Sequence, residues 1–67
     1  MLIKEEKQAI VETRIRNAEA NKLNLELDII QEQAKSNPET NKISKLELEI
    51  ADTDLQIAAL NNILNSL

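Results

Sequence analysis

Hydrophobic residues recur along this chain at alternating steps of three and four, the spacing of a helix that packs along one line of contact. The clearest line runs through the second half, and seven of its eight positions are aliphatic. It contains Ile43, Leu46, Ile50, Thr53, Ile57, Leu60, Leu64 and Leu67. A matching line in the first half contains Ala9, Thr13, Arg16, Ala20, Leu23, Leu27, Ile30 and Ala34. The pattern predicts two long helices.

One break separates the two helical patterns, at the segment Ser36-Asn37-Pro38-Glu39-Thr40. Proline disfavours a helical residue before it but suits the first position of a new helix. We therefore expect a first helix over about residues 3–35, a turn at about 36–38 with Asn37 as helix cap, and a second helix over about 38–65. A short turn between helices of similar length predicts one antiparallel coiled-coil hairpin, a single all-α domain covering residues 1–67.

Folding the chain about Pro38 brings the two lines together, with Ile30 near Leu46 and Leu27 near Ile50. Small residues then face large ones, as close packing prefers. We expect a core within the hairpin, made by Ala20, Leu23, Leu27, Ile30, Leu46, Ile50, Ile57 and Leu60.

A second apolar line lies roughly opposite the first on each helix, and a lone hairpin would leave it in water. An exposed apolar stripe of this size is typical of an interaction surface. We expect a protein interface made by Val11, Ile15, Ala18, Leu25, Ile29, Leu48, Ala51, Leu55 and Ala58. Its simplest partner is a second copy of the chain, giving a homodimer or higher homo-oligomer such as a four-helix bundle, and the alternative is a helical partner protein.

Composition narrows the possible functions. A chain of 67 residues buries little surface, and small domains usually rely on disulfides, a metal or oligomerisation. There is no Cys and no His, which excludes disulfides and the usual zinc sites. The net charge is −4, and the chain has neither clustered Lys and Arg nor any aromatic residue, so we do not expect it to bind nucleic acid.

The first residues lack the apolar segment of a signal peptide, and no membrane segment is expected. We therefore expect a cytoplasmic protein, or a virion-associated one if the chain comes from a phage. The acidic run Glu47, Glu49, Asp52 and Asp54 is interpreted as a solvated face, because it lacks the glycine and ligand spacing of a calcium loop. We expect no catalytic residues, no cofactor and no metal site, and therefore no enzyme.

Two architectural resemblances follow from the hairpin layout and the length. The chain resembles the plasmid-copy-number Rop family, whose members are dimeric four-helix bundles, and this resemblance implies a regulator that binds RNA. It is also similar to the small helical co-chaperones of type III secretion needle subunits. From the residues we expect a self-associating structural or assembly factor, such as a small phage or bacterial assembly protein. The alternatives are an adaptor, co-chaperone or inhibitor that binds a partner's apolar helix, and a Rop-like regulator.

Overall fold

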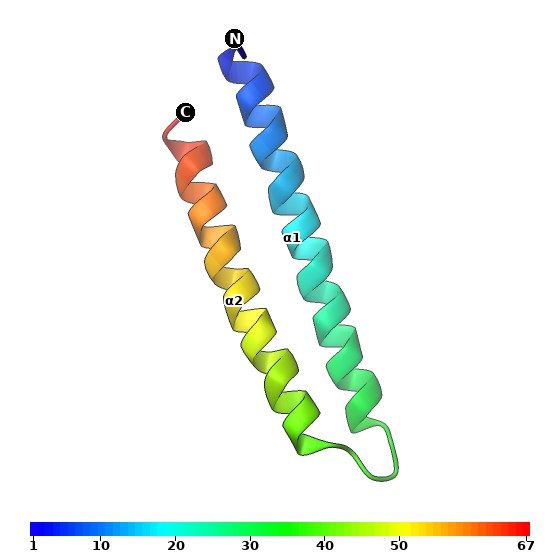
Figure 1. Ribbon diagram of the computed structural model, residues 1–67. Coiled ribbons are helices and arrows are strands. Elements are labelled where there is room, and N and C mark those ends of the chain that lie inside the picture. Colours follow the sequence, from blue (N-terminus) through cyan, green and yellow to red (C-terminus); the bar gives the residue numbers. More distant parts are fainter.

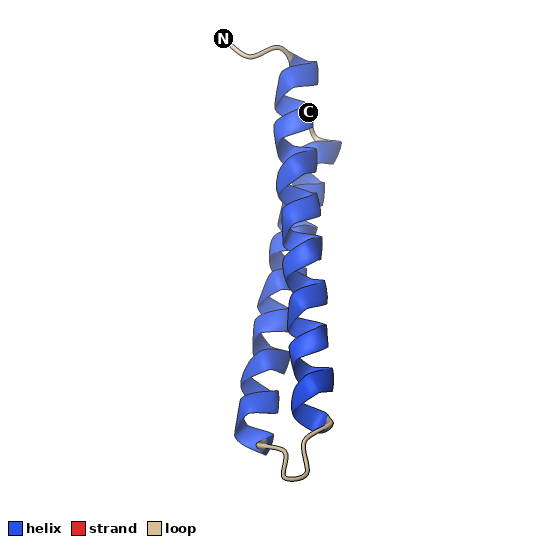
Figure 2. Ribbon diagram, turned by 90° about the vertical axis from the view of Figure 1, so that its right-hand side faces the viewer, coloured by secondary structure: helices blue, strands red, loops and turns tan.

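The computed structural model describes residues 1–67 and consists of two helices, α1 (Lys4–Gln33) and α2 (Thr40–Asn65). The helices run antiparallel and side by side, and both termini lie at the end opposite the connecting loop (Figure 1). The molecule is a rod of 54 × 15 × 14 Å. Seen from the side, one helix covers much of the other, so the rod is a single layer of two helices (Figure 2). The predicted all-α hairpin is confirmed.

The start of α1 is stabilised by acidic residues. Glu5 and Glu6 lie in its first turn, where negative charge complements the helix dipole. The Glu6 side chain also turns back, and its Oε1 accepts a hydrogen bond of 3.0 Å from the backbone N–H of Ile3. This bond satisfies an N–H group that the helix itself cannot pair.

The connection between the helices is longer than the turn expected at residues 36–38. Helix α1 is capped at Ala34, and α2 begins at Thr40 with Glu39 as its N-cap, so Asn37 and Pro38 lie in a loop of residues 34–39. The expectation that Asn37 caps a helix starting at Pro38 is wrong. The backbone N–H of Glu39 instead donates to the Glu32 carboxylate of α1 at 3.1 Å, which fixes where α2 starts.

The side of α2 that faces α1 is the line of eight residues spaced three and four apart. All of them are buried or half-buried, and Thr53 is 4% exposed. We call this line the inner seam of α2, and it contains Ile43, Leu46, Ile50, Thr53, Ile57, Leu60, Leu64 and Leu67.

On α1 the line that faces α2 differs from the expected one. Ile15 and Leu25 are each 8% exposed, whereas Leu23, Leu27 and Ile30 are 45–59% exposed. The inner seam of α1 therefore contains Val11, Ile15, Ala18, Lys22, Leu25, Ile29 and Glu32. The expected core positions Ala20, Leu23, Leu27 and Ile30 lie on the outside, and the expected interface positions Val11, Ile15, Ala18, Leu25 and Ile29 lie inside.

Three polar contacts between the helices mark the register in which this exchange occurs. Lys22 pairs with Asp54, Asn21 with Thr53, and Glu32 with Lys42. In this register Leu25 lies level with Ile50. The pairing expected from the sequence would instead have set Arg16 and Thr13 against leucines at the open end. The observed register sets Ile15 and Val11 at the open end, where their aliphatic side chains face α2.

Neither helix is long and apolar enough to cross a lipid bilayer.

Candidate functional site

Two lines of exposed aliphatic side chains run along the hairpin, one on each helix. On α1, Leu23, Leu27 and Ile30 are 56%, 45% and 59% exposed. On α2, Leu48 and Leu55 are 67% and 70% exposed. We call these lines the outer stripes. The outer stripe of α1 is completed by Ala20, and that of α2 by Ala51 and Ala58, all of which are exposed.

Each outer stripe lies nearly opposite the inner seam of its own helix. Its members follow inner-seam residues alternately by one and by two positions. At 3.6 residues per turn these steps are rotations of about 100° and 200°, so the two lines are on average about 150° apart. For example, Leu23 follows Lys22, and Leu27 follows Leu25 by two. Each helix therefore presents apolar residues on two sides, and the hairpin carries one outer stripe on each of its long edges.

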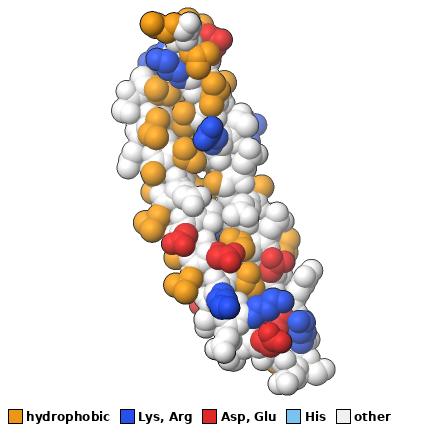
Figure 3. Space-filling model, in the orientation of Figure 1, with side chains coloured by type: hydrophobic (Ala, Val, Ile, Leu, Met, Phe, Trp, Pro, Cys, Tyr) orange, Lys and Arg blue, Asp and Glu red, His pale blue; other side chains and the backbone are white.

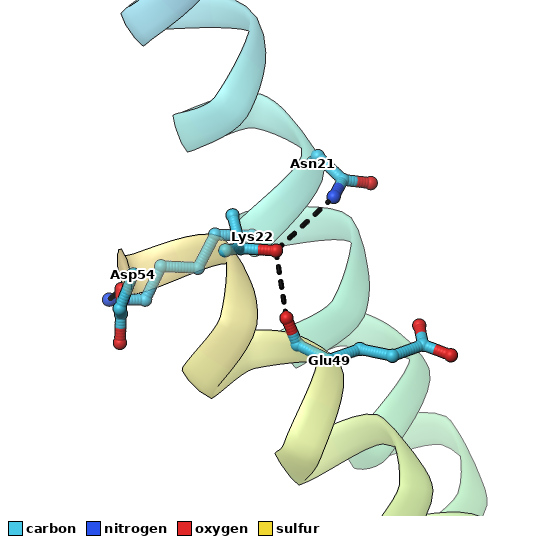
Figure 4. Close-up of polar contacts among 5 residues, drawn as sticks. Asn21, Lys22, Glu49 and Asp54 are labelled. Carbon is cyan, nitrogen blue, oxygen red and sulfur yellow. Dashed lines mark hydrogen bonds and ion pairs between the residues drawn. The ribbon is translucent and has the colours of Figure 1, made fainter. Parts of the chain in front are cut away.

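The middle of the inner seam contains a polar layer (Figure 4). The Thr53 hydroxyl donates to the backbone carbonyl of Glu49 at 2.8 Å, and Asn21 Nδ2 donates to Thr53 Oγ1 at 3.5 Å. Lys22 Nζ lies 2.8 Å from Asp54 Oδ1, and this hydrogen bond is the main reason why the pKa of Lys22 is raised. Because every buried polar atom is hydrogen-bonded, the layer is compatible with the surrounding aliphatic contacts.

The loop end of the inner seam is closed by a buried carboxylate. Glu32 is 2% exposed, and it accepts the Glu39 N–H and forms ion pairs with Lys35 at 2.7 Å and Lys42 at 3.5 Å. The hydrogen bond from Lys35, followed by that from Glu39, holds the pKa of Glu32 below its usual value and outweighs the effect of burial. Glu32 thus ties α1 to the N-terminal end of α2, where negative charge is favourable.

The two broad faces of the hairpin carry different polar groups. Glu19 and Glu26 lie three residues before and four residues after Lys22, on the side of α1 where Lys22 pairs with Asp54. On the opposite face, Arg14, Asn17 and Gln56 line a shallow groove between the helices. Figure 3 shows hydrophobic side chains concentrated toward the termini, with basic and acidic side chains among them, whereas most of the acidic side chains on this face lie toward the loop.

The groove is shallow and open to solvent. It lies in the half of the hairpin that carries the termini and continues along α1. The exposed side chains of Ile10 and Ile63 lie in this half, at 47% and 49% exposure. The groove is lined by Ala9, Ile10, Thr13, Arg14, Asn17, Gln56, Ala59 and Leu60.

The structure divides the interface residues predicted from the sequence. Those of α2 are exposed, as an interface requires, and they are Leu48, Ala51, Leu55 and Ala58. Those of α1 face α2, and their place on the outer edge is taken by Ala20, Leu23, Leu27 and Ile30. The contacts of Glu32 were not predicted. An acidic residue on an otherwise apolar line, followed in the sequence by Lys35 and Lys42, could have indicated a buried ion pair.

The acidic residues Glu47, Glu49, Asp52 and Asp54 do not converge, since Asp54 pairs with Lys22 and no group of three or more potential metal ligands is present. The feature suited to binding is the pair of outer stripes, which are apolar and have polar side chains beside them. No protein family, curated protein or solved structure matches the chain.

Proposed function

We propose that this chain is a non-catalytic coiled-coil interaction protein that associates with itself as a small structural or assembly factor. The observation that supports this most strongly is the exposure of Leu23, Leu27 and Ile30 along one edge, and of Leu48 and Leu55 along the other. Of the aliphatic residues, only Ile15 and Leu25 are less than a tenth exposed in the hairpin alone. A domain with so small a core gains stability by covering its outer stripes.

The size of the outer stripes supports association. Full burial of a leucine or isoleucine is worth about 1.5–3 kcal/mol, so covering the exposed half of one side chain is worth about 0.8–1.5 kcal/mol. A symmetric contact through Leu23, Leu27 and Ile30 of two copies involves six such side chains and contributes roughly 4.5–9 kcal/mol. This is the same order as the entropic cost of pairing two molecules, so the association depends on concentration.

The positions of the stripes also specify the kind of assembly. In a four-helix bundle each helix presents one apolar sector to a common core. Here the outer stripe and the inner seam of each helix are about 150° apart, which suits helices lying in a row, each between two neighbours. We therefore propose edge-to-edge pairing of hairpins in place of the closed four-helix bundle expected from the sequence.

Sedimentation equilibrium over a wide concentration range tests this proposal, with helicity measured on the same samples by far-UV circular dichroism. We expect a defined oligomer with high helicity that dissociates on dilution. A chain that remains a monomer at every concentration would overturn the proposal.

A second function, an adaptor that binds a helix of another protein, is favoured by the groove near the termini. Its apolar residues Ile10, Ala59 and Leu60 lie beside polar side chains, which include Asn17, Gln56 and the cationic Arg14. Such a surface accepts an amphipathic helix. In that case the isolated chain would be a weakly helical monomer and would gain helicity on binding its partner.

A further inference from the structure

The charges beside the outer stripe of α1 indicate how two copies would pair. This inference rests on the self-association proposed above and specifies its geometry. We propose that two copies pair through the outer stripe of α1 about a two-fold axis parallel to the helices, so that the two α1 helices are parallel and both loops lie at the same end.

Two straight columns of side chains flank the outer stripe of α1, because residues seven apart lie on one line of a helix in a coiled coil. The column on one side consists of Glu12, Glu19 and Glu26, and all three are exposed. The column on the other side consists of Asn17, Asn24 and Gln31, also exposed. The outer stripe therefore has one acidic margin and one uncharged margin.

The direction of pairing decides which margins meet. When two identical helices pack in parallel, the left margin of one faces the right margin of the other, as in parallel coiled coils. The carboxylates of Glu19 and Glu26 then face the amides of Asn24 and Gln31, whose N–H groups donate hydrogen bonds. Antiparallel packing would place the glutamate column of one copy against that of the other, and like charges at a helix interface repel.

Pairing between the outer stripes of α1 and α2 is disfavoured by the same reasoning. The outer stripe of α2 also has an acidic margin, with Glu47 and Asp54 on the side that carries Glu19 and Glu26. If a second copy lay beside the first in the same orientation, its α2 would run antiparallel to α1 of the first copy, and the two acidic margins would meet. Pairing of α1 with α1 in parallel avoids this contact.

The contact is confined to the half of α1 nearest the loop. Large aliphatic side chains occupy the outer stripe from Leu23 to Ile30, whereas the same line nearer the N-terminus contains Thr13 and Arg16. In parallel pairing, Leu27 meets Leu27 of the second copy at the same level, and the two Arg16 side chains mark the end of the apolar contact.

Disulfide cross-linking tests the direction of pairing, since the chain contains no cysteine of its own. Ile30→Cys is near one end of the contact, so two copies of residue 30 meet only if the α1 helices are parallel. In an antiparallel contact centred near Leu25, residue 30 would lie about 15 Å from its copy, at 1.5 Å per residue, and would instead lie near Ala20. The control variant Asp52→Cys places an exposed thiol on α2, outside both outer stripes.

We expect Ile30→Cys to cross-link nearly completely under mild oxidation, and Asp52→Cys at the low level of random collision. Adding Leu27→Asn to Ile30→Cys should reduce the cross-linking to that control level while far-UV circular dichroism shows unchanged helicity in dilute samples. If the wild type associates but only a mixture of Ala20→Cys and Ile30→Cys cross-links, the pairing is antiparallel and this inference is overturned, while the proposed function stands. If the wild type stays monomeric, both this inference and the proposed function are overturned.

Discussion

Leu25 and Leu27 are two residues apart on α1, yet they have opposite roles in the structure. Leu25 is 8% exposed and lies level with Ile50 in the inner seam, whereas Leu27 is 45% exposed on the outer edge. Replacing each by alanine removes the same atoms from the same helix. The pair therefore tests which line of α1 packs on α2, with helix propensity and side-chain chemistry held constant.

The expected magnitudes are well separated. Truncating a buried leucine costs about 2–5 kcal/mol, and a hairpin only two helices thick can relax into the space, which places Leu25→Ala near 2–3 kcal/mol. Truncating Leu27 in the monomer should change stability by about 0.5 kcal/mol or less. A domain of this size has roughly 3–10 kcal/mol of total stability, so Leu25→Ala removes a large part of it.

Urea unfolding followed by far-UV circular dichroism measures both variants, at a concentration where sedimentation shows monomers. With an m-value of about 1 kcal/mol/M, the midpoint of Leu25→Ala should fall by about 2–3 M, whereas that of Leu27→Ala should barely change. At concentrations where the chain associates, Leu27→Ala should also lose stability, and this loss should grow with concentration. An equal or larger loss for Leu27→Ala in the monomer would refute the observed register and restore the pairing expected from the sequence.

Other predictions concern the polar contacts of the inner seam. The pKa of Glu32 is lowered from the ordinary 4.5. Its ionised side chain should therefore stabilise the fold fully above pH 4.5, and this stabilisation should be lost as the pH falls through the lowered pKa. The melting temperature of Glu32→Gln should not show this fall in acid. Thr53→Val should increase the free energy of unfolding by about 0.5–1 kcal/mol and so raise the urea midpoint, because Thr53 is 4% exposed and its hydroxyl donates only within its own helix. A lower midpoint would mean that the hydrogen bond from Asn21 stabilises the fold more than the added methyl group does. Asp54→Asn should leave the midpoint almost unchanged because the ion pair with Lys22 is open to solvent, and a large loss would show that this pair fixes the register.

The hairpin and the inner seam of α2 could be predicted from the sequence for clear physical reasons. Pro38 cannot continue a helix, and the only break in the helical pattern surrounds it. On α2 the inner seam holds large aliphatic residues at seven of eight positions, whereas the outer stripe alternates Leu48 and Leu55 with alanines. The difference in apolar bulk between the two lines made the side that faces α1 recognisable.

The inner seam of α1 could not be identified in the same way, because the inner seam and the outer stripe of this helix contain similar numbers of large aliphatic residues, four and three. The choice depends on the register, and the register depends on where α2 starts. Expecting α2 to start at Pro38 shortened the loop and shifted the pairing onto Leu27 and Ile30. The polar residues held the missing information, since Lys22 and Glu32 lie on the line of α1 that faces α2 and each pairs there with an opposite charge.

The central claim is that the hairpin associates through its exposed outer stripe on α1 while the inner seam keeps it folded. Sedimentation equilibrium of the wild type beside the double variant Leu23→Gln, Leu27→Gln tests both parts in one comparison. The wild type should form an oligomer that dissociates on dilution, and the double variant should remain a monomer at every concentration with the helicity of the dilute wild type. Equal association of both proteins, or a wild type that is always monomeric, would contradict the claim.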